Sequence, residues 1–137
     1  MRILRLDIHH FRGISGFTLC PRGHVLLVGE PGSGRSTVLE ALHRVLSPDS
    51  TRLPLVDDFD FSGRDTKGDI SVEVVIGQLG RALEQDFFDH LEVWDDEAEA
   101  VVTHAAEPRS LDEKTQFVLR LCCQQRLNFD PLTTVGI

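Results

Sequence analysis

Eight consecutive residues near the amino terminus have the types and spacing of a phosphate-binding loop. The run Gly29-Glu-Pro-Gly-Ser-Gly-Arg-Ser36 follows the pattern G-x-x-x-x-G-K-[ST], except that arginine stands in place of lysine. In such a loop, small residues let successive backbone N–H groups surround phosphate oxygens, and the following helix directs the positive end of its dipole at them. The run predicts a nucleotide-binding site with these candidate residues: Gly29, Glu30, Pro31, Gly32, Ser33, Gly34, Arg35, Ser36 and Thr37.

Position 35 is the departure from this pattern. Arginine keeps the positive charge of lysine, but its guanidinium is planar and bulkier than the compact ammonium that lies between terminal phosphates. We therefore expect nucleotide binding to tolerate Arg35 better than hydrolysis does. The alternative interpretation is a glycine-rich turn between a strand and a helix that binds no ligand.

The segments on either side of the loop fit the elements that such a loop requires. Residues 25–28 are a short apolar run, which predicts a buried parallel strand. Residues 37–46 have helical periodicity, and Ser47-Pro48 ends that helix because the residue before proline avoids helical geometry. Glu40 lies on the side away from the phosphates and is predicted to be structural or at the surface. The predicted apolar face of the helix consists of Val38, Leu39, Leu42, Val45 and Leu46.

A hairpin is predicted ahead of the loop. Residues 2–11 alternate as a half-buried strand, with Leu4, Leu6 and Ile8 on one side. A turn at Ile14-Ser15, between two glycines, then leads into a second short strand that ends before Pro21.

Four further elements are predicted downstream. Residues 70–76 alternate as a strand, residues 78–91 carry apolar side chains four apart as in an amphipathic helix, and residues 101–103 fit an edge strand. Residues 116–124 alternate as a strand. Ser110 and Glu113 resemble a capping box, which favours a helix there, but the alternation favours the strand with only a turn at Ser110.

The chain of 137 residues has the length of one domain, which we predict to be a single, incomplete lobe. Its predicted parts are residues 1–48 with the hairpin, strand, phosphate loop and helix, residues 49–69 as a loop, and residues 70–137 as an acidic strand-helix-strand segment. The fold class predicted is α/β, with a mixed sheet.

Charge is unevenly distributed along the chain, whose net charge is −8. Residues 57–113 hold 17 acidic and four basic side chains, whereas residues 1–56 hold four acidic side chains and seven arginines. The acidic part is predicted to be solvated surface that repels nucleic acid. No apolar stretch is long enough for a membrane span or a signal peptide, so we expect a cytoplasmic protein. An odd number of cysteines predicts reduced, structural thiols at Cys20, Cys122 and Cys123.

Three segments in order resemble the amino-terminal lobe of ABC-type ATPases of the SMC, RecF and OLD-nuclease group, the OLD branch most of all. They are Ile8-His-His-Phe-Arg-Gly-Ile14, Val25-Leu-Leu-Val-Gly-Glu30 and Gly34-Arg-Ser-Thr-Val-Leu-Glu-Ala-Leu42. The resemblance is specific over residues 3–46, extends through Asp58-Phe59 and the strand after it, and is weak beyond residue 80.

This resemblance implies roles for individual residues. The backbone from Glu30 to Ser36 would surround the β-phosphate of ATP, and Arg35 would neutralise the β- and γ-phosphates. The Ser36 hydroxyl would bind Mg²⁺, and Thr37 would lie near the α-phosphate. Arg12 would reach the nucleotide from the hairpin, although a surface arginine in a turn explains that residue equally well.

The groups that hydrolysis requires are not evident in the sequence. A metal-organising Asp usually ends an apolar strand, with a Glu beside it to polarise water. Residues 91–97 and 55–58 are poor candidates, because Glu92 interrupts the first run and the second is only two apolar residues long. The chain also lacks a Leu-Ser-Gly-Gly signature and a nuclease metal constellation. We therefore expect ATP hydrolysis only with a missing half or a partner chain.

The leading hypothesis is an ATP-binding lobe of a DNA-associated ABC-type ATPase, which uses ATP and Mg²⁺. It would form a homodimer or associate with a complete ATPase, would contact DNA through a partner or through missing segments, and would not bind membranes. One alternative is a non-catalytic truncated paralogue that serves as a regulatory or assembly partner. A small P-loop kinase or NTPase is the other.

Overall fold

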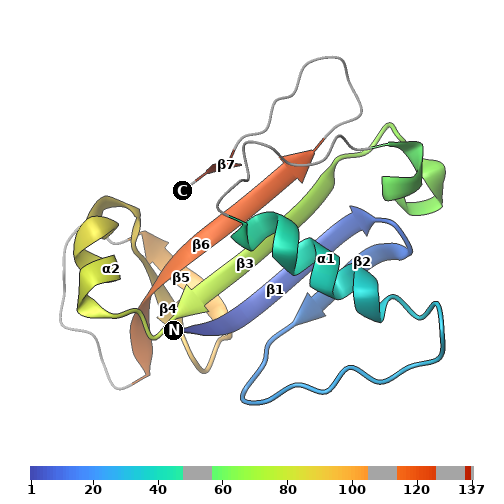
Figure 1. Cartoon of the computed structure of the whole chain (residues 1–137). Coiled ribbons are helices and arrows are strands. Elements are labelled where there is room, and N and C mark those ends of the chain that lie inside the picture. Colours follow the sequence, from blue (N-terminus) through green and yellow to red (C-terminus); the bar gives the residue numbers. More distant parts are fainter. Residues whose placement is uncertain (48–56, 105–113, 126–134, 137) are drawn as a thin grey trace.

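The computed structural model describes residues 1–47, 57–104, 114–125 and 135–136, which form a curled antiparallel sheet with one long helix across a face (Figure 1). The strands are β1 (Arg2–Phe11), β2 (Ile14–Leu19), β3 (Ile70–Gly77), β4 (Glu92–Asp95), β5 (Ala100–His104), β6 (Thr115–Gln125) and β7 (Val135–Gly136). The helices are α1 (Arg35–Leu46) and α2 (Arg81–Asp86), with 3₁₀ turns over Asp58–Asp60, Ser62–Arg64 and Phe88–His90.

Within the described residues the strand order is β2-β1-β3-β6-β4-β5, with β7 beside β6, and every pairing is antiparallel. The chain combines helices with strands, as predicted, but the mixed sheet predicted from the sequence is wrong for this part of the chain. The central strands β1, β3 and β6 are already paired on both sides, so they leave no position for a parallel strand between them.

Three strand predictions from the second half of the chain are confirmed. Alternate residues of β3 are buried against α1, as the apolar alternation of residues 70–76 predicted. The ambiguous carboxyl-terminal segment forms β6, which pairs with β3 along Ile70–Ile76. The predicted edge strand is β5, which lies at the end of the sheet. Ser110 and Glu113 lie outside the described residues, as do residues 49–56 of the predicted loop.

Strand β1 differs from its prediction at one position, because its register shifts between Ile3 and Arg5. The shift places Leu4 on the face away from α1, whereas Leu6 and Ile8 face the helix. A bulge adds one residue to a strand and so reverses the side on which that residue points. Leu4 packs there with Val75, Trp94 and Val118.

The hairpin is confirmed, but its turn lies at Arg12-Gly13 rather than at Ile14-Ser15. Phe11 pairs directly with Ile14, which leaves two residues for the connection. Tight two-residue hairpins need a positive φ in the turn, and Arg12 has a φ of 51°.

Helix α1 begins two residues before the predicted start and ends at Leu46 as predicted, with Ser47 in an extended conformation. Its buried side contains Val38, Ala41 and Val45, and Leu39 is 63% exposed. The predicted face was thus too broad: the sheet covers only the residues three or four apart that point directly at it. Leu46, also assigned to that face, is 42% exposed.

The predicted helix over residues 78–91 is much shorter in the structure, where α2 spans only Arg81–Asp86. Gln78 has a positive φ and Gly80 is extended, so the helix cannot begin earlier. At the other end, Leu91 is already extended and leads into β4, which pairs with β5 and β6. Sheet pairing therefore overrides the helical periodicity of this segment.

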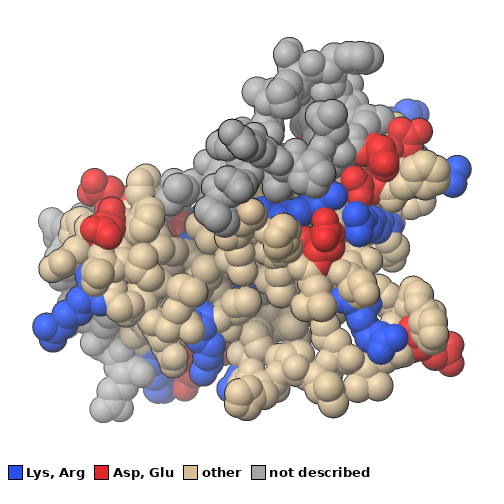
Figure 2. Space-filling model, viewed as in Figure 1, with Lys and Arg blue, Asp and Glu red and all other residues tan. Residues whose placement is uncertain are grey.

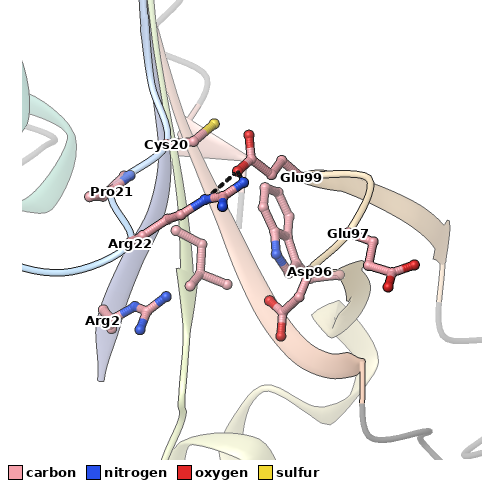
Figure 3. A pocket seen from close by; sticks show the side chains of 9 residues that line it. Arg2, Cys20, Pro21, Arg22, Asp96, Glu97 and Glu99 are labelled. Atoms are coloured by element: carbon pink, nitrogen blue, oxygen red, sulfur yellow. Dashed lines mark hydrogen bonds and ion pairs between the residues drawn. The ribbon is translucent and has the colours of Figure 1, made fainter.

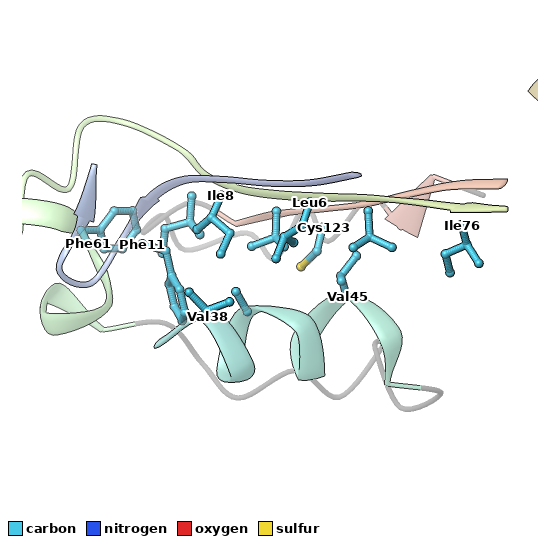
Figure 4. Close-up of a cluster of buried hydrophobic side chains, with 12 residues drawn as sticks. Leu6, Ile8, Phe11, Val38, Val45, Phe61, Ile76 and Cys123 are labelled. Atoms are coloured by element: carbon cyan, nitrogen blue, oxygen red, sulfur yellow. The ribbon is translucent and has the colours of Figure 1, made fainter. Parts of the chain in front are cut away.

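The main core lies between α1 and the sheet (Figure 4). Its buried members are Leu6, Ile8, Phe11, Val38, Ala41, Val45, Phe61, Ile70, Val72, Val74, Ile76 and Cys123. The three cysteines are free thiols, as predicted, and burial raises the pKa of each.

Acidic and basic side chains are interspersed on the face seen in Figure 2 rather than divided into two regions. Among the described residues, no helix is long and apolar enough to cross a bilayer.

Candidate functional site

The phosphate-loop sequence forms a tight turn directly before α1. The Ser33 N–H donates to the Glu30 carbonyl at 3.1 Å, which closes the turn. Gly32 and Gly34 have φ values of 83° and 92°, in the left-handed region that side chains rarely adopt. The backbone of this turn therefore requires glycine at both positions.

Gly29 is required for a different reason. A Cβ atom at this position would lie 2.3 Å from the Ser33 Oγ, which is closer than two unbonded atoms can approach. Of the two glycines that the motif fixes, Gly29 lets the Ser33 side chain approach the backbone closely. Gly34 allows a backbone conformation with positive φ. This geometry gives a physical reason for the pattern that the sequence alone predicted.

The amino terminus of α1 has the features of an anion site. The helix has 12 residues, Gly34 offers no side-chain cap, and the first turn holds no acidic residue. The first N–H groups of a helix lack intrahelical acceptors and carry the positive end of its dipole. Ser36 is exposed in this first turn and Thr37 is half-buried; that their hydroxyls serve a bound phosphate and its cation stays a prediction.

Arg35 is exposed and folds back across the turn. Its Nη2 lies 3.5 Å from the Glu30 carbonyl oxygen, at the limit of hydrogen bonding. The guanidinium therefore brings a positive charge to the loop without being buried or paired with a carboxylate in any contact described.

The apolar run over residues 25–28 is not the buried parallel strand that was predicted. It forms no strand within the described residues, and Leu26 and Val28 are 85% and 80% exposed. Leu27 alone packs against the core. A continuous apolar strand needs neighbours on both edges and cover on both faces, and the antiparallel sheet supplies neither beside this run.

The hairpin turn lies next to the phosphate loop. A Cβ at Gly34 would be in ordinary contact, at 3.8 Å, with the Cγ1 of Ile14. Arg12 donates from Nε to the Asp60 Oδ1 at 2.9 Å, and its Nη2 lies 4.0 Å from the Glu40 Oε1. Arg12 therefore bonds to carboxylates beside α1, and that it reaches the nucleotide from the hairpin stays a prediction.

A buried charged cluster behind α1 was not found by sequence reasoning. Arg44 is only 3% exposed. It donates from Nη1 to the Gln125 Oε1 at 2.9 Å, and from Nη2 to the Asp60 Oδ2 at 3.4 Å. Its Nε lies 3.4 Å from the Glu40 Oε1, so Glu40 takes part in this ion-pair cluster. Glu40 follows Ser36 by four residues and so shares its side of α1, and the prediction that Glu40 lies on the side away from the phosphates is wrong. The available signal was the position of Arg44, three residues after Ala41 on the side of the helix that packs.

The Phe11 ring lies close to both guanidinium groups of this cluster. The Cζ of Arg12 is 5.0 Å from the centre of the Phe11 ring, and the Cζ of Arg44 is 4.9 Å from it. Cations over the face of an aromatic ring are attracted by its quadrupole. The Phe11 backbone also forms an isolated antiparallel β-bridge with Phe61, which joins β1 to the segment around residue 60.

The poor candidates for a catalytic carboxylate have structural contacts. Asp95 accepts the N–H groups of Glu97 and Ala98 at 2.8 and 3.0 Å, and these bonds hold its pKa below the ordinary value. Glu92 is buried and pairs with Arg120 at 2.6 Å. Asp57 accepts the Phe59 N–H and caps a 3₁₀ turn. No group of three metal-ligating side chains occurs in the part of the chain that the structure describes.

A hollow of about 430 Å³ is lined in part by Leu4 and Trp94, which pack together on the face of the sheet away from α1 (Figure 3). This hollow does not include the phosphate loop. On its rim, Arg22 donates from Nη2 to the Glu99 Oε1 at 2.6 Å. This ion pair connects the segment after β2 with the turn between β4 and β5. The hollow is lined by side chains of both charges: Arg2 and Arg22, and Asp96, Glu97 and Glu99.

The amino-terminal part of the chain is similar to a known protein family. Residues 2–54 match the family described as the P-loop containing region of AAA domain. The matched region includes β1, β2, the phosphate loop and α1, and it is consistent with nucleotide binding. No curated protein matches the chain.

Proposed function

We propose that the chain is the ATP-binding lobe of a DNA-associated ABC-type ATPase of the OLD, RecF and SMC group, with ATP and Mg²⁺ held by residues 29–37. One observation carries this proposal: a glycine-dependent turn opens directly into an uncapped helix, within a region that matches a P-loop family. Backbone N–H groups at such a turn are suited to phosphate oxygens.

Each proposed ligand has a place in this geometry. The backbone from Glu30 to Ser36 binds the β-phosphate, and Arg35 places its charge near the β- and γ-phosphates. Ser36 offers its hydroxyl to Mg²⁺ because it is exposed at the start of α1. Thr37 lies near the α-phosphate, and Arg12 approaches from the hairpin turn.

We further propose that residues 1–48 hold the nucleotide, whereas residues 49–69 and 70–137 make up the rest of a single, incomplete lobe. Two acidic residues of the candidate run over residues 91–97, Asp95 and Glu92, have structural contacts. Hydrolysis then depends on carboxylates and a signature loop from elsewhere, and DNA is contacted through those parts too.

A second function is favoured by the exposed apolar side chains near the loop. Leu26, Val28 and Leu39 are large and exposed, and such a surface is typical of a site that another polypeptide covers. The chain would then be a non-catalytic regulatory or assembly partner of a complete ATPase. ATP turnover by the chain alone would exclude this role, whereas tight association without turnover would support it.

The test of the leading proposal is a titration of the chain with ATP, with and without Mg²⁺. We expect Mg²⁺-dependent binding that Ser36→Ala weakens by about tenfold, because it removes the proposed metal ligand. Ser47→Ala, at the opposite end of the same helix, is the matched control and should leave the affinity unchanged. Wild-type protein that shows no Mg²⁺-dependent binding would overturn the proposal.

A further inference from the structure

Asp60 is the residue at which the hairpin turn and the phosphate-loop helix meet. Its carboxylate accepts the Arg12 Nε at 2.9 Å and the Arg44 Nη2 at 3.4 Å. Its backbone carbonyl also accepts the Arg12 N–H at 2.7 Å. One buried acidic residue, 7% exposed, therefore holds both the main chain and the side chain of Arg12, as well as the helix.

The position of Asp60 is itself fixed by its own segment. Asp60 and Asp57 form a reciprocal capping box around the 3₁₀ turn over Asp58–Asp60. Phe61, the next residue, is buried and bridges to Phe11. Asp60 is therefore held by contacts on both sides along the chain, and can set the position of the groups that it binds.

The contacts leave part of the Arg12 side chain available. Asp60 binds its Nε, while the side chain is 40% exposed and its Nη2 lies 4.0 Å from Glu40. Glu40 and Ser36 are four residues apart on α1 and so share a side of the helix. The terminal nitrogens of Arg12 are thereby directed to the side of α1 that carries the proposed Mg²⁺ ligand.

We propose that Asp60 is a positioning residue of the nucleotide site, which orients Arg12 toward the bound phosphates through its hydrogen bond to Nε. This inference rests on the proposed ATP-binding function. It adds a residue outside the motif and outside the region that matches the P-loop family. The competing explanation is that Asp60 only neutralises the buried charge of Arg44.

The test is the affinity of the full chain for ATP and Mg²⁺ in Asp60→Asn. We expect about tenfold weaker binding, the size expected from loss of one charge-assisted hydrogen bond. The matched control is Asp7→Asn. Asp7 is also buried and accepts from an arginine and a hydroxyl, Arg5 and Thr18, each at 2.6 Å, but it lies outside the cluster. We expect this control to bind ATP within about twofold of wild type.

A double-mutant cycle separates positioning from mere structural support. If Asp60 acts through Arg12, then Asp60→Asn should have no further effect on affinity in an Arg12→Ala background. Equal affinities of Asp60→Asn and Asp7→Asn would overturn the inference, and so would an undiminished effect of Asp60→Asn without Arg12. Absence of ATP binding by wild type would instead overturn the proposed function itself, and this inference with it.

Loss of Asp60 leaves the buried Arg44 short of a partner and can destabilise the fold. The second variant is therefore Asp60→Asn combined with Arg44→Met, which removes both charges and keeps an apolar side chain against the sheet. We expect it to fold more stably than Asp60→Asn alone, yet to retain the tenfold loss of affinity. Recovery of wild-type affinity in this double variant would show that Asp60 serves only Arg44, and would overturn the inference.

Discussion

The two ends of α1 differ in how the rest of the chain supports them. At the carboxyl-terminal end, Val45 is buried against the sheet and Arg44 is bonded to Asp60 and Gln125. At the amino-terminal end, the phosphate loop is exposed, and its described contacts are local ones such as that between Ser33 and Glu30.

This difference separates two sources of the site's geometry. The shape of the loop comes from glycine conformations and short-range bonds, whereas its position comes from the packing of α1 far from the ligand. Packed elements resist displacement, while exposed loops change shape at small cost. We therefore expect substitutions at one end to change stability and at the other to change affinity.

The largest effect on stability should come from Phe11→Ala. Phe11 is fully buried, its ring lies close to two guanidinium groups, and its backbone pairs with Phe61. Its removal leaves a cavity and should lower the free energy of unfolding by about 3–5 kcal/mol, measured by urea denaturation.

The control for this prediction is Phe88→Ala, because Phe88 is 52% exposed and lies outside the main core. We expect its cost to be well under 1 kcal/mol. Similar losses for the two variants would contradict the assignment of Phe11 to the rigid region.

An intermediate effect, on affinity rather than on stability, should come from Gly34→Ala. A Cβ at this position meets only Ile14, at an ordinary distance of 3.8 Å, so the cost arises from the φ of 92°. A left-handed conformation costs a side-chain-bearing residue about 1–2 kcal/mol. The exposed loop can avoid this cost when free but must pay it when it binds phosphate, so ATP affinity should fall about tenfold.

Gly80→Ala is the matched control, since a Cβ there meets nothing within 4 Å and its φ is −77°. It should change neither ATP affinity nor stability measurably. An unaltered affinity in Gly34→Ala would mean that the loop binds in another conformation than the one described.

The same division explains what could be predicted from the sequence. The phosphate-loop glycines, the hairpin, β3 and α1 follow from local patterns, because turn conformation, strand alternation and helix periodicity are each encoded within a few residues. Local patterns failed where distant pairing decides the outcome. The helix over residues 78–91 gave way to β4, and a bulge moved Leu4 to the opposite face.

Asp60 and Arg44 illustrate the part of the site that the sequence could not supply. They are 16 residues apart, and Gln125 is a further 65 residues along the chain, so no local spacing links them. The position of Arg44, three residues after Ala41, was the one local signal of its burial, and its partners depend on how the sheet is assembled. The apolar run over residues 25–28 failed for the same reason, since a strand exists only where another strand pairs with it.

The smallest effect should come from Leu26→Ser. The side chain of Leu26 is 85% exposed, so the polar substitution should change the free energy of unfolding by less than about 0.5 kcal/mol. Its neighbour Leu27 packs against the core, and Leu27→Ser should cost about 1 kcal/mol or more. Urea denaturation of both variants therefore tests the conformation of this run directly. Equal and large losses would mean that both leucines are buried, as in the paired strand that the sequence suggested, and the contrast between an anchored helix and an exposed loop would not hold.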